Sequence, residues 1–138
     1  MTSRCPFCTK DRPQDDSIQI EQGSVYFLRS PDPVLQCAGM IIPLRHVSTP
    51  FDLTQTEWND TFELLGKAKL LLDQDSPDGY NIGWNVNPVA GQTVPHVHLH
   101  VIGRFVDEPF AQQGIRHHLK KQENIRSSHV RFGTDSRP

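Results

Sequence analysis

Three histidines, His96, His98 and His100, recur at every second position and alternate with aliphatic residues. Side chains two residues apart on a strand point to the same face and lie about 6.6–6.8 Å apart. We therefore predict a strand with three imidazoles on one face and an aliphatic row on the other. A solvated polar face would account for one alternating histidine, but three in a row favour a chemical role.

A row of imidazoles suits metal binding or nucleophilic attack. Three histidines along one strand span about 13 Å, so they cannot all meet at one ion with bond lengths near 2 Å. A neutral imidazole is nucleophilic near pH 7, and one ring nitrogen can be anchored while the other attacks. Attack on phosphorus needs hydrogen-bond donors already in place around the phosphate oxygens. His98 is the candidate nucleophile, and the candidate donors are His100, Asn85 and Thr93.

Two of the three cysteines stand close together, as Cys5 and Cys8. An odd number of cysteines without a signal sequence is a poor fit to a disulfide framework. A Cys-x-x-Cys pair in a cytosolic chain is more typical of a metal half-site or a redox pair, and the residues alone leave both open. Cys37 lies in an apolar stretch and is predicted to be a small core residue.

One long helix is predicted between these two groups of residues. Thr54 and Glu57 form a capping box, so the helix is expected to begin at Gln55 and to run to about Asp75. A turn at residues 76–79 ends it. Spacings of three and four predict one apolar, core-facing row, made of Trp58, Phe62, Leu65, Ala68 and Leu72.

The remaining pattern is that of strands. A hairpin is predicted around Gln22 and Gly23, and a short buried strand over residues 40–42. Apolar residues alternate with polar ones from Ile82 to Val86 and again over residues 97–101, which predicts two antiparallel strands joined by a loop. After Arg104 the chain is polar, with a possible short helix over residues 114–122.

Composition limits the class of protein. The chain has 138 residues, a formal net charge of −2 and 36% hydrophobic residues. These values predict one folded domain over residues 1–138, with a Cys-x-x-Cys knuckle at 1–12 and a flexible tail at 124–138. The charge gives no reason to expect a nucleic-acid partner. No apolar run approaches the roughly 18 residues of a membrane span, so we expect a cytoplasmic protein.

The segment from Ala90 to Ile102 resembles the signature of the histidine triad superfamily, in which three histidines alternate with apolar residues. Its Gly-Gln-Thr-Val lead-in is similar to the fragile histidine triad and diadenosine polyphosphate hydrolase branches, as are residues 43–47 and 51–53. The resemblance implies an α+β fold. It has a mainly antiparallel sheet of about five strands, one long helix and a short C-terminal helix, and it usually forms a homodimer.

The resemblance also implies roles for single residues. His98 would be the nucleophile of a nucleotide hydrolase or nucleotidyl transferase, and His100 would contact the scissile phosphate. Asn85, Gln92 and Thr93 would line the phosphate site. The substrate would be a phosphate anhydride, such as a diadenosine polyphosphate, or a nucleoside phosphoramidate. It would be cleaved through a covalent nucleotidyl-histidine intermediate.

In zinc-containing relatives a structural ion is held at positions that correspond to Cys5, Cys8, His46 and His96. A closed Cys2His2 set suits a structural rather than a catalytic ion. Two departures from the family concern nucleoside recognition: residues 36–38 replace a Pro-Gly-His segment, and the ribose-binding residue is replaced near residues 29–30. Two rival functions follow: a zinc-stabilised nucleotide-binding module with little turnover, and a zinc metallohydrolase.

Overall fold

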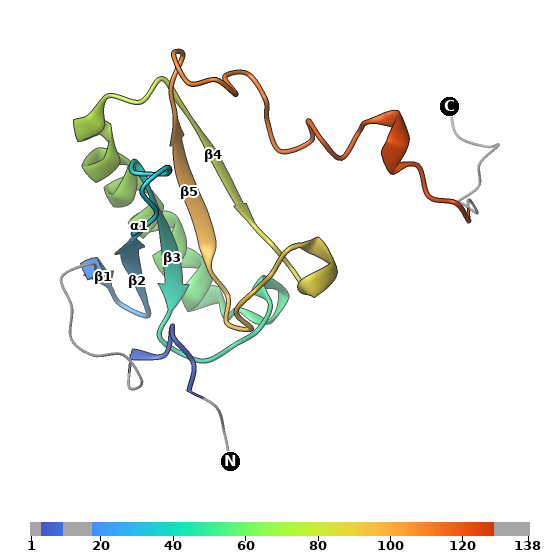
Figure 1. The fold of residues 1–138 in the computed structure, drawn as a ribbon. Coiled ribbons are helices and arrows are strands. Elements are labelled where there is room, and N and C mark those ends of the chain that lie inside the picture. The colour runs from blue at the N-terminus through green and yellow to red at the C-terminus, as the bar shows by residue number, and fades with distance from the viewer. Residues whose placement is uncertain (1–3, 10–17, 129–138) are drawn as a thin grey trace.

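One antiparallel sheet organises the chain (Figure 1). The structure is a computed structural model, and it describes residues 4–9 and 18–128. The sheet order is β1-β2-β3-β5-β4, and each neighbouring pair is antiparallel. This confirms the expected five-stranded α+β fold. The strands are β1 (Ile18–Gln22), β2 (Val25–Arg29), β3 (Ala38–Pro43), β4 (Gly79–Trp84) and β5 (Leu99–Arg104).

The predicted helix is confirmed as α1 (Gln55–Leu72), which continues into a 3-10 turn, η3 (Asp73–Asp75). The capping box forms as expected. The backbone N–H of Glu57 donates to Oγ1 of Thr54 over 3.1 Å, and Oε1 of Glu57 accepts from the backbone N–H of Thr54 over 2.9 Å. These contacts satisfy two backbone donors that a helix start otherwise leaves without a partner.

The predicted core-facing row of α1 is partly wrong. Trp58 and Phe62 are 40% and 77% exposed, whereas Leu64 is fully buried and packs against the sheet. Spacings of three and four fit either of two neighbouring apolar rows, and contact with the sheet selects the row that contains Leu64. The buried positions of α1 are Glu57, Thr61, Leu64, Ala68 and Leu72.

The two faces of the sheet have different surroundings. α1 packs on one face, and the main core lies between them, with Phe27, Ile41 and Val101 from the sheet. Because Met40 pairs with His100 and alternates with core residues, His100 lies on the other face. His100 is therefore held on a sheet whose opposite face packs on the core.

The histidine row does not lie wholly on a strand. β4 ends at Trp84 and β5 begins at Leu99, so both strands are shorter than predicted on their shared loop side. The backbone N–H of Val97 donates to the carbonyl of Val47 over 2.7 Å, in the loop after β3. That bond draws the residues before Leu99 away from β4, so only His100 of the three histidines belongs to the ladder.

The C-terminal part is also more irregular than predicted. After β5 the chain forms no further strand in the part that the structure describes, and residues 115–120 form turns rather than a helix. The only helical segment described after Arg104 is the 3-10 turn η5 (Gln122–Asn124). An isolated short helix has little stability without a surface to pack on, and apolar residues here, such as Ile115 and Leu119, remain exposed.

Two further 3-10 turns, η2 (Pro50–Asp52) and η4 (Pro88–Ala90), lie in the loops before α1 and before the histidine row. Within the described ranges, no helix has both the length and the apolar character that crossing a membrane requires. The predicted knuckle at 1–12 includes residues 1–3 and 10–12, and the predicted tail at 124–138 includes residues 129–138; these residues lie outside the described part of the chain.

Candidate active site and metal centre

The orientation of His98 suits a nucleophile. Its Nδ1 lies 2.8 Å from the carbonyl oxygen of His96. A carbonyl oxygen can only accept, so Nδ1 must donate, and in the neutral ring the lone pair is then on Nε2. The His98 side chain is buried, and the ring of Phe7 packs edge-on against it with 4.9 Å between centroids. The nitrogen that carries the lone pair is thus selected by the backbone of its own segment.

His100 lies next to His98, with 5.0 Å between the ring centroids. It is half-buried in β5, between Met40 of β3 and Gly83 of β4. Burial lowers the pKa of His100, and the neighbouring His98 lowers it further. His100 therefore favours the neutral form, in which one nitrogen donates and the other accepts.

The loop before the histidine row is shaped by Gln92. Its Oε1 accepts from the backbone N–H of Asn87 over 2.8 Å, and its Nε2 donates to the carbonyls of Ser48 and Val94 over 2.9 and 3.1 Å. The Gln92 side chain therefore joins this loop to the loop after β3. Sequence reasoning placed Gln92 at the phosphate and did not foresee this bridge.

Asn85 and Thr93 lie at the two ends of the same loop. The amide nitrogen of Asn85 is 3.5 Å from the position that a Cβ on Gly91 would occupy. Gly91 has φ +100, which favours glycine. Asn85 and Thr93 are both exposed, so their polar groups can be reached by a ligand.

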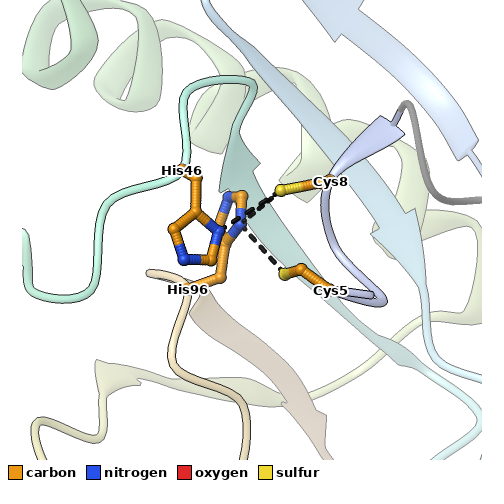
Figure 2. Close-up of side chains that lie close together, drawn as sticks. All are labelled: Cys5, Cys8, His46 and His96. Carbon is orange, nitrogen blue, oxygen red and sulfur yellow. Dashed lines mark hydrogen bonds between the residues drawn. The ribbon is translucent and has the colours of Figure 1, made fainter. Parts of the chain in front are cut away.

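Four side chains from three distant segments converge on one point (Figure 2). They are the four residues named from the sequence: Cys5, Cys8, His46 and His96. Their ligand atoms all lie within 4.8 Å of one another. The two cysteines are brought together by a turn in which the backbone N–H of Cys8 donates to the carbonyl of Cys5 over 3.2 Å.

The distances fit a tetrahedral ion. Zn–S bonds near 2.3 Å and Zn–N bonds near 2.0–2.1 Å place neighbouring sulfur and nitrogen ligands roughly 3.6 Å apart. Sγ of Cys8 lies 3.3 Å from Nδ1 of His46 and 3.6 Å from Nδ1 of His96, and Sγ of Cys5 lies 3.5 Å from Nδ1 of His96. The donor set and its spacing are compatible with a closed Cys2His2 metal site.

The outer contacts of this cluster also suit a metal. Nε2 of His96 donates to the carbonyl of Pro43 over 2.8 Å, which leaves Nδ1 with its lone pair facing the thiols. Burial is the main cause that lowers the pKa of His96, so the ring favours its neutral, metal-binding form. Phe7, between the two cysteines in sequence, packs edge-on against both His96 and His98 and so connects the cluster to the candidate nucleophile.

A second contact that the sequence did not reveal holds the loop of His46. Nε of Arg45 donates to Oε2 of Glu57 over 3.0 Å, and its second terminal nitrogen donates to Oε1 over 2.9 Å. The Arg45 hydrogen bonds are the main cause that lowers the pKa of the buried Glu57 carboxyl. Glu57 was recognised only as a capping residue, whereas it also ties the residue before His46 to α1.

Comparison with known proteins shows the family of this chain. Residues 12–107 match the HIT domain, so the chain belongs to the histidine triad (HIT) family. It is 34% identical over 112 residues to the bis(5'-nucleosyl)-tetraphosphatase [asymmetrical] of Schizosaccharomyces pombe, a match that covers 77% of this chain and 62% of that protein. It is 35% identical over 82 residues to the bis(5'-adenosyl)-triphosphatase of Saccharomyces cerevisiae, covering 58% and 40%. The chain thus spans less than two thirds of each relative.

Solved structures show the same fold. A HIT family protein from Bacillus anthracis superposes with a TM-score of 0.69 at 27% identity, over 78% of this chain and 77% of that one. A hypothetical protein from Leishmania major gives a TM-score of 0.68 at 29% identity, over 79% and 78%.

Proposed function

We propose that the chain is a nucleotide hydrolase that cleaves a phosphate anhydride of a dinucleoside polyphosphate, with His98 as nucleophile. The observation that carries the proposal is the bond from Nδ1 of His98 to the His96 carbonyl, which leaves the lone pair on Nε2 for attack. The names of the two fungal relatives support the substrate class. A nucleoside phosphoramidate, with nitrogen in place of the leaving oxygen, is the second substrate that this chemistry accommodates.

The reaction would proceed in two displacements. Nε2 of His98 forms a bond to phosphorus while the P–O bond to the leaving nucleotide breaks, and the electron pair departs with the oxygen. Water then attacks the same phosphorus, loses a proton, and the N–P bond breaks to restore the imidazole. His100, Asn85 and Thr93 would donate to the phosphate oxygens in both steps. Gln92 would hold the loop that presents Thr93.

We also propose that Cys5, Cys8, His46 and His96 bind a structural zinc ion. With all four protein ligands present, the ion would lack an open position, which a catalytic zinc needs. Its effect on the reaction would be indirect, because Phe7 and His96 both contact or position His98. Thiolate ligands are kept reduced in the cytoplasm, which is where we place the protein.

A homodimer through the free edge of β4 completes the proposal. β4 ends the sheet order, so one side of its backbone has no neighbouring strand among the described residues. Beside it, a groove of about 390 Å³ between α1 and β4 is lined by Phe62, Leu65 and Ile82. Phe62 is 77% exposed and Ile82 is 43% exposed. An unpaired edge beside exposed apolar side chains favours pairing with a second copy.

The nucleophile is tested with diadenosine tetraphosphate. His98→Ala should lower the rate of hydrolysis by at least about a thousandfold, or about 4 kcal/mol of transition-state stabilisation, while binding changes far less. His117→Ala, outside the site, is the matched control. Mass spectrometry of a reaction quenched in denaturant at alkaline pH, where the N–P bond is stable, should find one nucleotidyl adduct on the wild-type protein and none on His98→Ala. Undiminished turnover by a folded His98→Ala protein would refute the assignment.

The rival functions give different results in the same experiment. A nucleotide-binding module would bind the substrate without forming product. A metallohydrolase would lose its chemistry as soon as a chelator removed the ion, without unfolding. A structural ion instead predicts that activity falls together with loss of the folded state.

The dimer is tested by light scattering at micromolar concentrations. Phe62→Glu should convert a dimer to a monomer, because it places a charge in the apolar groove beside β4. Phe51→Glu, at a site that is 83% exposed in η2, is the matched control. A monomeric wild-type protein, or a dimer that tolerates Phe62→Glu, would count against this interface.

A further inference from the structure

A second cavity lies on the face of the sheet that carries His100. It has a volume of about 530 Å³, and its floor is formed by Asn81, Ile102 and Arg104. Asn81 and Ile102 pair across β4 and β5, and Ile102 stands two residues after His100, so all three share one face. The proposed phosphate chemistry does not use this cavity.

The guanidinium of Arg104 holds together the segments that line the cavity. Nε donates to Oε1 of Glu108 over 2.6 Å, one terminal nitrogen donates to the carbonyl of Gln113 over 2.9 Å, and the other to the carbonyl of Phe110 over 2.8 Å. It also bonds Asn81. These contacts hold the segment after β5 against the sheet, and all three nitrogens of the guanidinium donate hydrogen bonds within the protein. Because Glu108 balances the charge, the cavity is a formed and mainly uncharged site.

The cavity is close to the triad. Ile115, from the same C-terminal segment, places its Cδ1 3.8 Å from the position of a Cβ on Gly83. Gly83 pairs directly with His100. The C-terminal segment therefore passes over β4 beside His100, and a ligand can extend from one site to the other along the same face of the sheet.

The lining suits a flat heteroaromatic ring. Pro109 and the loop residues Val34 and Leu35 form apolar walls, and Ile102 adds an apolar side chain to the floor. Phe110 lines the cavity while 65% exposed, so its ring can stack on a ligand. Gln113 and His118 add hydrogen-bonding groups at the rim. Small-molecule sites typically have such apolar walls, few polar groups and volumes of about 300–1,000 Å³.

We propose that this cavity binds the nucleobase of the leaving nucleotide of a dinucleoside polyphosphate. The inference rests on the proposed function. Ile102 follows His98 by four residues of extended chain, roughly 13 Å. The nucleoside bonded to the attacked phosphate is held close to His98, whereas the leaving nucleoside is carried further by its additional phosphates. Three exposed cations on the same segment, Arg116, Lys120 and Lys121, suit those phosphates.

The test compares two substrates that differ only in the second nucleoside: diadenosine tetraphosphate and adenosine 5'-tetraphosphate. Phe110→Ala should raise KM for the first by about tenfold or more, since base stacking on an aromatic side chain is worth that much. It should leave KM for the second unchanged. Phe51→Ala is the matched control. Val34→Trp, at a position 85% exposed, should fill the cavity and act like Phe110→Ala.

Each outcome decides the proposal. Equal effects on both substrates would mean that the cavity holds the nucleoside of the attacked half. An unchanged KM, with a changed oligomeric state, would mean that a second copy occupies it. Either result overturns the inference. If the wild-type protein hydrolyses neither substrate, the proposed function fails separately, and calorimetric binding of ATP decides the subsite. Binding weakened by Phe110→Ala, but not by Phe51→Ala, supports the subsite, and unaffected binding overturns it.

Discussion

Removing both thiol groups of the proposed zinc site, as Cys5→Ser/Cys8→Ser, should destabilise the whole domain. Cys8 is 38 residues from His46 and 88 residues from His96 in the chain. An ion at this point would join the N-terminal segment to the loop after β3 and to the histidine row. The two long loops that it closes would then be restricted in the unfolded chain.

The size of the effect follows from these separations. With the chain-entropy expression used for covalent cross-links, closing a loop of 38 residues is worth about 4 kcal/mol. A loop of 88 residues gives about 4.6 kcal/mol. The two are not additive, so we expect a loss of about 4–5 kcal/mol. For a chain of 138 residues this corresponds to a decrease in Tm of roughly 12–20 °C.

The assay is thermal unfolding with and without chelator, together with elemental analysis of protein purified without chelator. The wild-type protein should hold about one equivalent of zinc, and chelator should lower its Tm. The double variant should hold no zinc, and chelator should leave its Tm unchanged. Cys37→Ala is the matched control, because Cys37 is buried away from the cluster and should leave the zinc content unchanged. A wild-type protein with reduced Cys5 and Cys8 but less than about a tenth of an equivalent of metal would refute the reasoning.

Three further predictions concern the scaffold. Leu64→Ala should lower the free energy of unfolding by about 2.7–5 kcal/mol, because Leu64 is fully buried between α1 and the sheet; denaturant titration measures it, and a loss below about 1 kcal/mol would contradict this packing. Gly39→Ala should cost about 1–3 kcal/mol, because a Cβ there would overlap the ring of Phe27; a neutral effect in the same titration would argue against the close approach. Glu57→Gln should make the free energy of unfolding depend less on pH below about pH 4.5. The Arg45 hydrogen bonds lower the pKa of Glu57, so their contribution to stability is present above pH 4.5 and is lost as the pH falls below it. If the free energy of unfolding falls with pH to the same extent in the wild-type protein and in Glu57→Gln, this prediction is wrong.

Much of the local structure could be predicted from the sequence because it depends on neighbouring residues. The capping box of Thr54 and Glu57 identified the first residue of α1, since its hydrogen bonds span only three positions. Gly23 marked the hairpin of β1 and β2, and it has φ +55 in the structure. The alternation of β4 and β5 followed from the period of two. The resemblance to the HIT family then supplied roles for residues that spacing alone left open.

Tertiary structure decided the rest, because it depends on which distant segments meet. The Val97–Val47 bond shortened the histidine strand, and packing on the sheet selected the Leu64 row of α1. Residues 88 positions apart in the chain, Cys8 and His96, face one another in the cluster. No local pattern encodes that approach. The same holds for the cavity behind Arg104, since its walls come from the β2–β3 loop, two strands and the C-terminal segment. Backbone propensity acts over a few residues, whereas such sites arise from burial and hydrogen bonding between elements that only the complete fold brings together.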